Sequence, residues 1–317
     1  MSKKALVTGG AGFIGSHVAA RLLEAGWTVR VLDDLSSGDR AKLPTFAKDL
    51  EFVEGDIRDV AVCQKACAGI DAVFHLAALV SVVGSVENPA LNNAINITGM
   101  LNMLIAARDS GVQRFVFSSS ASVYGDAEQI PTEENQPLKP QSPYAVSKAC
   151  GEMYGRNFQE LFGLEVVSLR YFNVFGPRQN VTSGYAAVVP AFVKAAMNGK
   201  QPTIFGDGLQ TRDFVFVENV AEANLKAATA EGVSGQVFNV AGGQQTSLLD
   251  LVAALERATG KPLTPRFEPA RGGEVKHSRA DVDRARDILG FVPTVSLEEG
   301  LRRTVEGTIA WESSQAA

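Results

Sequence analysis

A short apolar segment that runs into clustered glycines and then into a helix constrains this chain more than any other feature. Residues 5–8 form the predicted strand, and Gly10, Gly12 and Gly15 follow it with the spacing G-x-G-x-x-G. In this pattern the glycines allow a tight turn, close approach of backbone to a pyrophosphate and close packing of helix on strand. The helix N-terminus adds N–H donors and the positive end of its dipole. The turn therefore predicts a dinucleotide-binding unit, although from this motif alone a glycine-rich turn without a ligand is the alternative.

The second predicted strand, residues 28–32, ends at an acidic pair. Asp33 lies eighteen positions after Gly15, near the offset of about 20 that is typical of the carboxylate on an adenosine ribose. Such a carboxylate binds the ribose hydroxyls and repels a 2′-phosphate, and no arginine directly follows Asp33 and Asp34. The spacing favours NAD over NADP. Taken by itself, Asp33 also fits a solvated turn.

Apolar β-branched segments alternate with longer helical patterns over the first half of the chain. This alternation is typical of a parallel sheet covered by helices on both faces. The predicted strands are residues 5–8, 28–32, 50–54, 72–76, 114–118 and 165–171, and the predicted helices are residues 14–25, 60–68, 92–110 and 144–161. We therefore expect the fold class to be α/β: a Rossmann-type doubly wound parallel sheet with a smaller mixed α/β substrate-binding domain.

Glycines and prolines interrupt this alternation after Tyr171. Beyond that point we expect shorter elements, including helices at residues 247–258 and 281–289 and a strand near residues 237–241. A length of 317 residues suits about two domains. The expected division is a dinucleotide-binding domain at residues 1–172, to which the strand–helix–strand pattern of residues 214–241 returns, and a substrate-binding domain at residues 173–213 and 242–317.

The charge balance excludes one large class of partner. Thirty lysines and arginines oppose 35 aspartates and glutamates, for a formal net charge of −5. A nucleic-acid binder usually carries a basic face, so we expect no nucleic-acid partner. Net charge does not exclude small anionic ligands, because a few local arginines suffice to bind a phosphate.

Cysteine and histidine usage predicts neither a disulfide framework nor a metal site. The three cysteines, Cys63, Cys67 and Cys150, include no C-x-x-C pair, and the three histidines share no ligand spacing. Such usage favours a reducing, cytosolic compartment. The first residues lack the apolar core of a signal peptide, and no apolar run approaches the roughly 20 residues that span a bilayer. We expect a cytoplasmic protein with no membrane partner.

Hydroxyl and amine side chains suited to proton transfer stand in two segments. Tyr144 and Lys148 lie four positions apart on a predicted helix and so share a face. A nearby ammonium lowers the pKa of a phenol and makes it a usable general acid and base, although an amphipathic face gives such a pair by chance. Ser120 follows a predicted strand whose carboxyl end faces the ligand crevice of a parallel sheet. We expect Ser120 to bind a reacting oxygen beside Tyr144, with a simple turn as the alternative.

Further motifs follow in order along the chain, and together they are far more specific than any one of them. They are Gly9-x-x-Gly12-x-x-Gly15, Gly55-Asp56-Ile57-Arg58-Asp59, His75-Leu76-Ala77-Ala78, the run from Ser118 to Gly125, Tyr144-x-x-x-Lys148, Arg170-Tyr171-Phe172-Asn173 and Arg212-Asp213. The ordered set resembles the extended short-chain dehydrogenase/reductase family and its NAD-dependent epimerases and dehydratases. Within that family it most resembles the UDP-glucose and UDP-N-acetylglucosamine 4-epimerases. The likeness runs from about residue 4 to about residue 305.

The resemblance implies a role for each matching residue. NAD is the implied cofactor and a UDP-sugar the implied substrate, with Ser120, Tyr144 and Lys148 as the catalytic residues. The implied cofactor-binding residues are Gly9, Gly12, Phe13, Ile14 and Gly15 at the pyrophosphate, Asp33 and Asp34 at the ribose, Asp56 and Ile57 at the adenine, Leu76, Ala77 and Ala78 along the cofactor, and Asn96, Ser118, Tyr144, Lys148 and Phe172 at the nicotinamide side. The implied substrate-binding residues are Ser120, Tyr144, Asn173, Val188, Thr203, Phe205, Arg212, Arg271 and Ser278, with Arg212 and Arg271 at the diphosphate.

The reaction implied by the resemblance is epimerisation at C4 of a UDP-hexose such as UDP-Glc or UDP-Gal. Tyr144 as phenolate removes the 4-hydroxyl proton while hydride passes to NAD. The 4-keto sugar then turns over about its diphosphate linkage, and hydride returns to the other face. Ser278 falls where family members restricted to unacetylated hexoses carry a bulky tyrosine. We therefore expect UDP-GlcNAc and UDP-GalNAc to be accepted too, unless a different loop length moves Ser278 away from that position.

Related activities stay open from the sequence. Ala121 and Ser122 stand after Ser120, where the resembling 4,6-dehydratases carry an acidic pair, which argues against a dehydratase. A UDP-glucuronate 4-epimerase or a reductase is an alternative, as is, in another class, a non-catalytic NAD-sensing protein. The family also implies a homodimer through the helices near residues 92–110 and 144–161. Val80 departs from the family, because some members have a substrate-binding lysine there.

Overall fold

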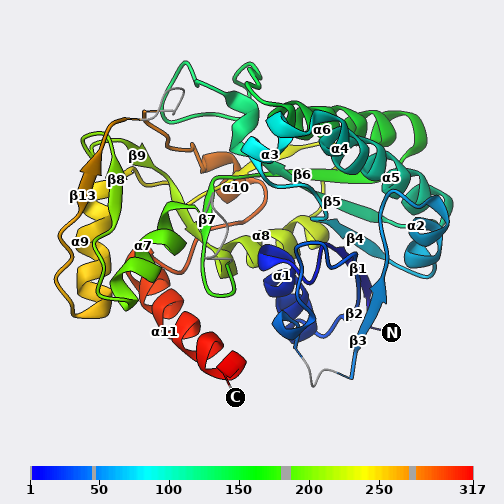
Figure 1. Ribbon diagram of the computed structural model, residues 1–317. Helices are drawn as coiled ribbons and strands as arrows, with labels where there is room; N and C mark the ends of the chain where they lie inside the picture. Colours follow the sequence, from blue (N-terminus) through cyan, green and yellow to red (C-terminus); the bar gives the residue numbers. More distant parts are fainter. Residues whose placement is uncertain (1, 45–47, 180–186, 271–275, 317) are drawn as a thin grey trace.

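A computed structural model describes residues 2–44, 48–179, 187–270 and 276–316 (Figure 1). Its centre is a seven-stranded sheet in the order β11-β6-β5-β4-β1-β2-β3, in which all neighbouring strands are parallel. The prediction of an α/β fold with a Rossmann-type sheet is confirmed. The strands are β1 (Lys4–Thr8), β2 (Thr28–Asp33), β3 (Leu50–Glu54), β4 (Ala72–His75), β5 (Arg114–Ser120), β6 (Glu165–Tyr171) and β11 (Val237–Val240).

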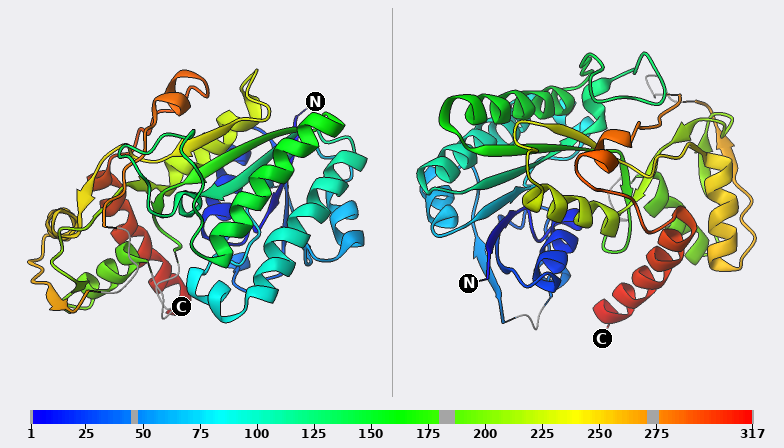
Figure 2. Two further views of the ribbon diagram at one scale, coloured as in Figure 1. Left: turned by 90° about the horizontal axis from the view of Figure 1, so that it is seen from above. Right: turned by 180° about the vertical axis from the view of Figure 1, so that it is seen from behind.

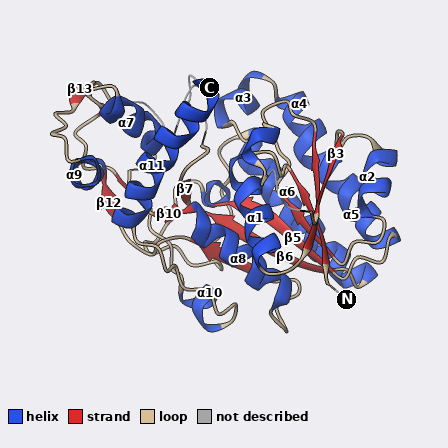
Figure 3. Ribbon diagram, turned by 90° about the horizontal axis from the view of Figure 1, so that it is seen from below, coloured by secondary structure: helices blue, strands red, loops and turns tan. Residues whose placement is uncertain are grey.

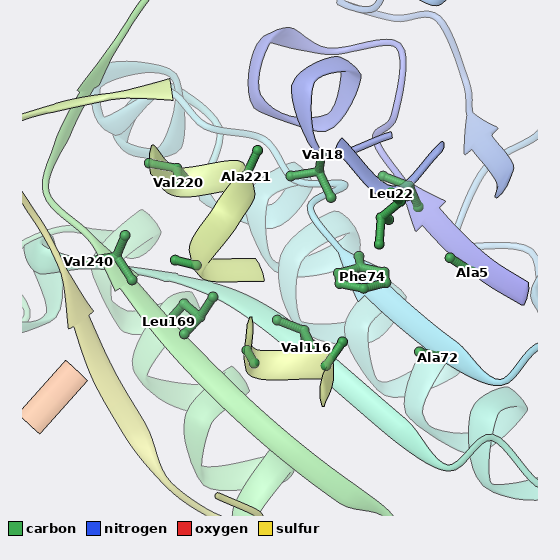
Figure 4. Packing of buried hydrophobic residues seen from close by; sticks show 14 of the residues in the cluster. Ala5, Val18, Leu22, Ala72, Phe74, Val116, Leu169, Val220, Ala221 and Val240 are labelled. Atoms are coloured by element: carbon green, nitrogen blue, oxygen red, sulfur yellow. The ribbon is translucent and has the colours of Figure 1, made fainter. Parts of the chain in front are cut away.

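Helices cover both faces of this sheet because each central strand is apolar on both sides. Figures 1 and 2 show α6, α5 and α2 on one face and α1 and α8 on the other. Figure 4 shows side chains of α1 and α8, such as Val18 and Val220, meeting those of the strands, such as Phe74 and Leu169. The helices are α1 (Phe13–Glu24), α2 (Val60–Cys67), α5 (Met100–Asp109), α6 (Pro143–Phe162) and α8 (Val217–Thr229).

The helix that carries the predicted tyrosine and lysine has a well-defined start and end. The Ser142 hydroxyl accepts a hydrogen bond from the backbone N–H of Ala145, and Pro143 occupies the first turn, where its missing N–H costs nothing. Gly163 ends α6 in the left-handed conformation, with φ at 72°. Local sequence therefore determines where α6 begins and where it ends.

The helix predicted at residues 92–110 differs from the structure in its start and its winding. The helical segment begins at Pro89, where the Asn88 side chain accepts from Leu91 N–H, so Asn88 is the N-cap. It comprises α4 (Pro89–Asn93), a π-helical segment η2 (Ala94–Gly99) and α5. A π-segment inserts one residue into a turn and re-aims the side chains that follow it. Hydrophobic periodicity gives no sign of such an insertion.

A second group of elements packs at the carboxyl end of the sheet. Figures 1 and 3 show α7, α9 and α11 together, on the side of the molecule away from α2 and α5. Their apolar side chains share one core with Phe175 and Phe216. This group contains β8 (Thr203–Phe205), β9 (Thr211–Arg212), β12 (Thr246–Ser247), β13 (Arg266–Glu268), α7 (Val188–Met197), α9 (Leu248–Thr259) and α11 (Leu297–Ala316).

The strand–helix–strand segment at residues 214–241 is divided between the two groups. The helix α8 lies on the main sheet, and β11 pairs with β6 at its edge. The first strand, β10 (Phe214–Phe216), instead pairs with β7 (Asn173–Phe175) in a separate two-stranded sheet. The chain therefore passes from one group to the other at Phe172 and again at Phe216.

The remaining short elements connect these groups. The helix predicted at residues 281–289 is shorter in the structure, where it is the helix α10 (Asp283–Asp287). Across the described segments, no helix is both long and apolar enough to cross a membrane. The connecting elements are η1 (Arg40–Lys42), α3 (Val82–Glu87), η3 (Ala121–Tyr124) and α10 (Asp283–Asp287).

Candidate active site

The glycine turn between β1 and α1 forms a cradle with no room for side chains. Gly9 has φ at +68°, and a Cβ on it would lie 2.7 Å from the backbone nitrogen of Ala77. A Cβ on Gly15 would lie 2.1 Å from the carbonyl oxygen of Gly9. The N-terminus of α1, after Gly12, has no side-chain cap and no acidic residue in its first turn. The orphan N–H groups of that turn therefore suit an anion such as a pyrophosphate.

Carboxylates lie at the carboxyl ends of β2 and β3, the two strands that follow β1 in the sheet. Asp33 ends β2, and its two oxygens accept hydrogen bonds from Ala11 N–H and Leu35 N–H, each at 2.9 Å. Burial raises the pKa of Asp33, and these backbone donors partly oppose that effect. Each oxygen keeps a second lone pair for a hydroxyl donor. The predicted ribose-binding carboxylate is thus fixed beside the glycine turn by the turn's own backbone.

The other residues predicted at the adenosine end differ in their surroundings. Asp34 is exposed, and one of its oxygens accepts from the backbone and hydroxyl of Ser36. Asp56 follows β3 and forms an ion pair with Arg58, which lowers the pKa of Asp56. The Ile57 side chain is buried in the core between α2 and α5, and its carbonyl accepts hydrogen bonds from Cys63 Sγ and Asn102 Nδ2.

Asn96 joins the loop after β4 to the start of α6. Its Oδ1 accepts from Leu79 N–H at 2.7 Å, and its Nδ2 donates to the carbonyl of Leu79 at 3.1 Å. The same Nδ2 lies 3.1 Å from the hydroxyl of Ser147, which donates to the carbonyl of Tyr144 at 2.7 Å. Asn96 belongs to the π-segment, so the extra residue there aims its amide at both elements. The loop of Leu76, Ala77 and Ala78 is thereby held beside Tyr144.

Tyr144, Lys148 and Ser120 meet where β5 ends beside α6. The Lys148 ammonium lies 5.8 Å from the centroid of the Tyr144 ring and donates to the carbonyl of Ser118 at 2.7 Å. Ser120 forms a hydrogen bond with the Tyr144 phenol. Tyr144 and Lys148 share one face of α6, as their spacing predicts. Ser118 contributes its carbonyl here, while its hydroxyl faces Tyr171 at 3.0 Å.

The protonation of these groups is governed by burial. Burial raises the pKa of Tyr144, and the hydrogen bond with Ser120 lowers it. Burial also lowers the pKa of Lys148 to about 8, and the charge of Glu152 opposes that change. A protonated Lys148 beside the phenol would favour the phenolate, because an opposite charge nearby stabilises the charged form.

A buried ion pair behind these residues was not predicted from the sequence. Glu152 on α6 pairs with Arg170 on β6, and the two side chains are 6% and 4% exposed. Glu152 stands one helical turn after Lys148, which is a signal that an i, i+4 comparison along α6 would have found. Arg170 belongs to a motif quoted above, but nothing in the sequence indicates that it faces Glu152.

The residues predicted to bind substrate lie mainly in the second group of elements. Phe172 is buried beside Tyr124, and the Asn173 amide donates to the carbonyl of Asp213 at 3.1 Å. Asp213 in turn accepts from the backbone of Gly242, Gly243 and Ala280, and so fixes three segments relative to one another. Half-buried side chains elsewhere in this group are Val188 at the start of α7, Thr203 and Phe205 in β8, Arg212 in β9, and Ser278. Arg271 lies outside the described residues.

The histidines have local partners rather than a common one. His17 bonds the carbonyl of Pro177, His75 bonds the hydroxyl of Thr8, and His277 bonds Thr211. Within the ranges that the structure describes, no three histidine, cysteine, aspartate or glutamate side chains gather as metal ligands would. The three cysteines are free thiols.

Fold, glycine cradle and tyrosine site together define a class of protein. The model of the NAD dependent epimerase/dehydratase family matches residues 5–241, which run from within β1 to just beyond β11. The chain belongs to this family.

Individual relatives resemble the chain over nearly its whole length. It is 42% identical over 307 residues to a UDP-glucose 4-epimerase of Mycolicibacterium smegmatis, covering 96% of this chain and 97% of the relative. A solved UDP-N-acetylglucosamine 4-epimerase from Methanobrevibacter ruminantium, in complex with UDP-N-acetylmuramic acid, superposes with a TM-score of 0.94 at 40% identity, covering 98% and 99% of the two chains. A UDP-glucose 4-epimerase from Thermotoga maritima, with UDP-glucose, superposes with a TM-score of 0.92 at 40% identity, covering 98% and 99%.

Proposed function

We propose that this protein is an NAD-dependent UDP-hexose 4-epimerase. The observation that carries the proposal is that the Tyr144 phenol has both the Ser120 hydroxyl and the Lys148 ammonium as neighbours, at the carboxyl end of β5. The cradle and Asp33 fit NAD because they offer free N–H donors to a diphosphate and an anchored carboxylate to a ribose. When bound, NAD supplies the hydride acceptor and donor for the sugar C4.

The side chains of this site carry the proton. Tyr144, as the phenolate, takes the proton of the sugar 4-hydroxyl. Before that transfer, the hydrogen bond from Ser120 and the charge of Lys148 stabilise the phenolate. Lys148 is held in place by the carbonyl of Ser118. Because Tyr144 returns the same proton at the end of the cycle, the reaction needs no outside acid or base.

The second group of elements supplies the nucleotide-sugar side in this proposal. Residues 173–213 and 242–317 form the substrate-binding domain, and Arg212 with Arg271 binds the diphosphate. A guanidinium suits a phosphate because it donates two parallel hydrogen bonds. The net charge of −5 cannot attract an anionic nucleotide sugar, so its binding must rest on local groups such as these two arginines.

The accepted sugars are proposed to include N-acetylated hexoses. Ser278 is small and half-buried in the segment that precedes Ala280, and the solved relative from Methanobrevibacter ruminantium is a UDP-N-acetylglucosamine 4-epimerase. Interconversion of UDP-Glc and UDP-Gal would place the protein in galactose metabolism. Incubation with UDP-Glc, UDP-GlcNAc and UDP-glucuronate in turn, with NMR of the products, tests the proposal. A 4-keto-6-deoxy product, net NAD(P)H consumption, or NAD binding without turnover would each overturn it.

Two further properties are proposed with this function. The three free thiols suit a reducing, cytoplasmic location, which cell fractionation tests. A homodimer is supported by exposed apolar side chains on α3 and α6, two helices that lie against each other. Val86 and Met153 are 62% and 64% exposed there, an arrangement typical of a surface that is covered by a partner.

A further inference from the structure

A buried charged pair lies one helical turn behind Lys148. Glu152 Oε2 accepts from Arg170 Nη2 at 2.7 Å and Glu152 Oε1 accepts from Arg170 Nε at 2.9 Å, so the pair is bidentate. Such geometry fixes the direction of both side chains as well as their charges. The pair joins α6, which carries Tyr144, to β6, which is the neighbour of β5 in the sheet.

Both members of the pair have further partners around the end of β5. The Ser119 hydroxyl donates to Glu152 Oε1. Arg170 Nη1 donates to the Tyr124 hydroxyl at 2.8 Å, and that hydroxyl donates to Asn239 on β11 at 2.6 Å. Glu152 therefore binds the end of β5 at Ser119. The residue before it, Ser118, accepts the hydrogen bond from Lys148, and the residue after it, Ser120, is bonded to Tyr144.

Stability alone is a poor reason for burying this pair. Apolar residues of similar volume are often as stable as a buried ion pair, or more so, because both charges lose their hydration. An electrostatic effect on a neighbouring group would explain why the pair is charged. The Glu152 carboxylate lies near the buried Lys148 ammonium, whose charged form it favours.

The groups that face Lys148 identify which charge matters. On α6 these are Tyr144 and Glu152, on β5 the Ser118 carbonyl and the Phe117 ring at 5.1 Å, and on β4 His75. Burial and the charge of Lys148 hold His75 neutral, with its pKa lowered to about 3. Glu152 is the group whose negative charge favours the ammonium, and Arg170 fixes its position.

We propose that Glu152 is a positioning residue of the reaction: paired with Arg170, it anchors the end of β5 through Ser119 and keeps Lys148 charged beside Tyr144. This inference rests on the proposed epimerase function for its kinetic consequence. It does not rest on that function for its electrostatic consequence, because the ionisation of Lys148 is measurable without turnover.

The test compares Glu152→Gln with the unaltered protein in two measurements. Glutamine keeps an acceptor for Ser119 but leaves Arg170 without its counter-charge. In protein carrying ¹³C-labelled lysine, with the signal assigned from a Lys148→Met variant, we expect the Lys148 titration to move to lower pH by about one unit, the usual scale for loss of a close opposite charge. The alkaline limb of kcat should move by the same amount, with KM for UDP-Glc changed less than about twofold because Glu152 does not contact the sugar.

Two further variants complete the design. Glu160→Gln removes an exposed glutamate on the same helix that pairs with Arg156, and it should leave both measurements unchanged. Glu152→Gln with Arg170→Gln removes both charges at once, which avoids an unpaired buried arginine. If the single variant does not fold, this double variant carries the test, with a shift in the same direction and of smaller size.

The outcomes separate the two proposals. A Lys148 titration that coincides with the unaltered protein in a folded variant would overturn the role of Glu152, whatever the activity. A loss of kcat that is equal at every pH would also overturn it, because a merely structural fault has no reason to follow the ionisation of Lys148. No epimerisation by the unaltered protein would instead overturn the proposed function and leave the titration as the test of Glu152.

Discussion

The ammonium of Lys148 is tied to the carbonyl of Ser118 by a hydrogen bond of 2.7 Å. This bond joins α6 to β5 near the carboxyl end of the strand, and it places a charge 5.8 Å from the centre of the Tyr144 ring. The partner is a neutral carbonyl, so the hydrogen bond orients the ammonium without cancelling its charge. The charge is thus left to act on the phenol.

Replacement of Tyr144 by phenylalanine should abolish turnover and leave the cofactor bound. The change removes the hydroxyl that is proposed to carry the proton, and such groups contribute about 10²–10⁴-fold to rate. We expect kcat with UDP-Glc to fall by at least about 10²-fold. Product NMR gives the rate, and the absorbance of released NAD gives the occupancy. Activity within tenfold of the unaltered protein would remove Tyr144 from its proposed role.

Gly15→Ala should weaken NAD binding. The added Cβ would lie 2.1 Å from the carbonyl oxygen of Gly9, so the turn has to open and the N–H donors of α1 move. Calorimetric titration with NAD should show affinity reduced by at least about tenfold, or 1.4 kcal/mol.

Gly26→Ala is the matched control at the other end of α1. A Cβ there meets nothing within 4 Å, and only its φ of +79° opposes the change. It should cost about 1 kcal/mol of unfolding free energy and leave NAD affinity unchanged. Equal losses of affinity in both variants would mean that the cradle has no special role.

Ser278→Tyr should discriminate between the two classes of sugar. A large ring in place of a half-buried hydroxymethyl group fills the space that the N-acetyl group is proposed to occupy. We expect kcat/KM for UDP-GlcNAc to fall at least about tenfold while that for UDP-Glc changes by less than about threefold. Ser278→Ala should change neither. If both sugars lose activity equally, Ser278 does not set the size limit.

Unfolding free energy should fall as pH is lowered below about 6.5, in part through His75. Burial lowers the pKa of His75 from 6.5 to about 3 in the folded protein. Between these values the unfolded state binds more protons, so His75 contributes a loss of about 1.4 kcal/mol per pH unit as pH falls. Asparagine can keep the bond to the Thr8 hydroxyl, so His75→Asn should remove that slope.

Urea unfolding at several pH values between about 4.5 and about 6.5 measures this slope. Burial also lowers the pKa of His17 to about 4, so His17 contributes a separate part of the slope that His75→Asn should leave in place. A His75→Asn variant with the original slope would show that another group causes the acid sensitivity.

Charging the exposed apolar surface of α6 should separate the proposed dimer. If the unaltered chain of 33.7 kDa forms a C2 dimer, light scattering should give a molar mass of about twice that value. Met153→Glu should give the monomer mass, because an unpaired carboxylate in an apolar interface is costly. Ile309→Glu on α11, at a side chain 50% exposed, should have no effect. A monomeric unaltered protein would refute the dimer outright.

Local sequence was sufficient for the fold class and for the two segments that define the site. The alternation of apolar strands and helices predicts the parallel sheet because each strand must be covered on both faces. The glycine turn can also be predicted from the sequence, since only glycine tolerates backbone atoms as close as those around Gly15. The shared face of Tyr144 and Lys148 follows from helical spacing alone.

Other features could not be predicted because they depend on which strands become neighbours. Arg170 meets Glu152 only because β6 pairs with β5 in register and α6 packs across both. The π-segment that aims Asn96 at Leu79 and Ser147 leaves no trace in hydrophobic periodicity. The pairing of β10 with β7, rather than with the main sheet, depends in the same way on long-range packing.

The sequence by itself determined the local structures: where strands end in glycine or serine, where α6 begins and ends, and which of its residues share a face. The tertiary structure alone decided the electrostatic environment of those residues. Burial changes the free energy of a charge far more than any sequence neighbour does, because it removes water on all sides. That is why Tyr144 and Lys148 are recognisable from their spacing, whereas the pairing of Glu152 with Arg170 behind them is recognisable only in the folded chain.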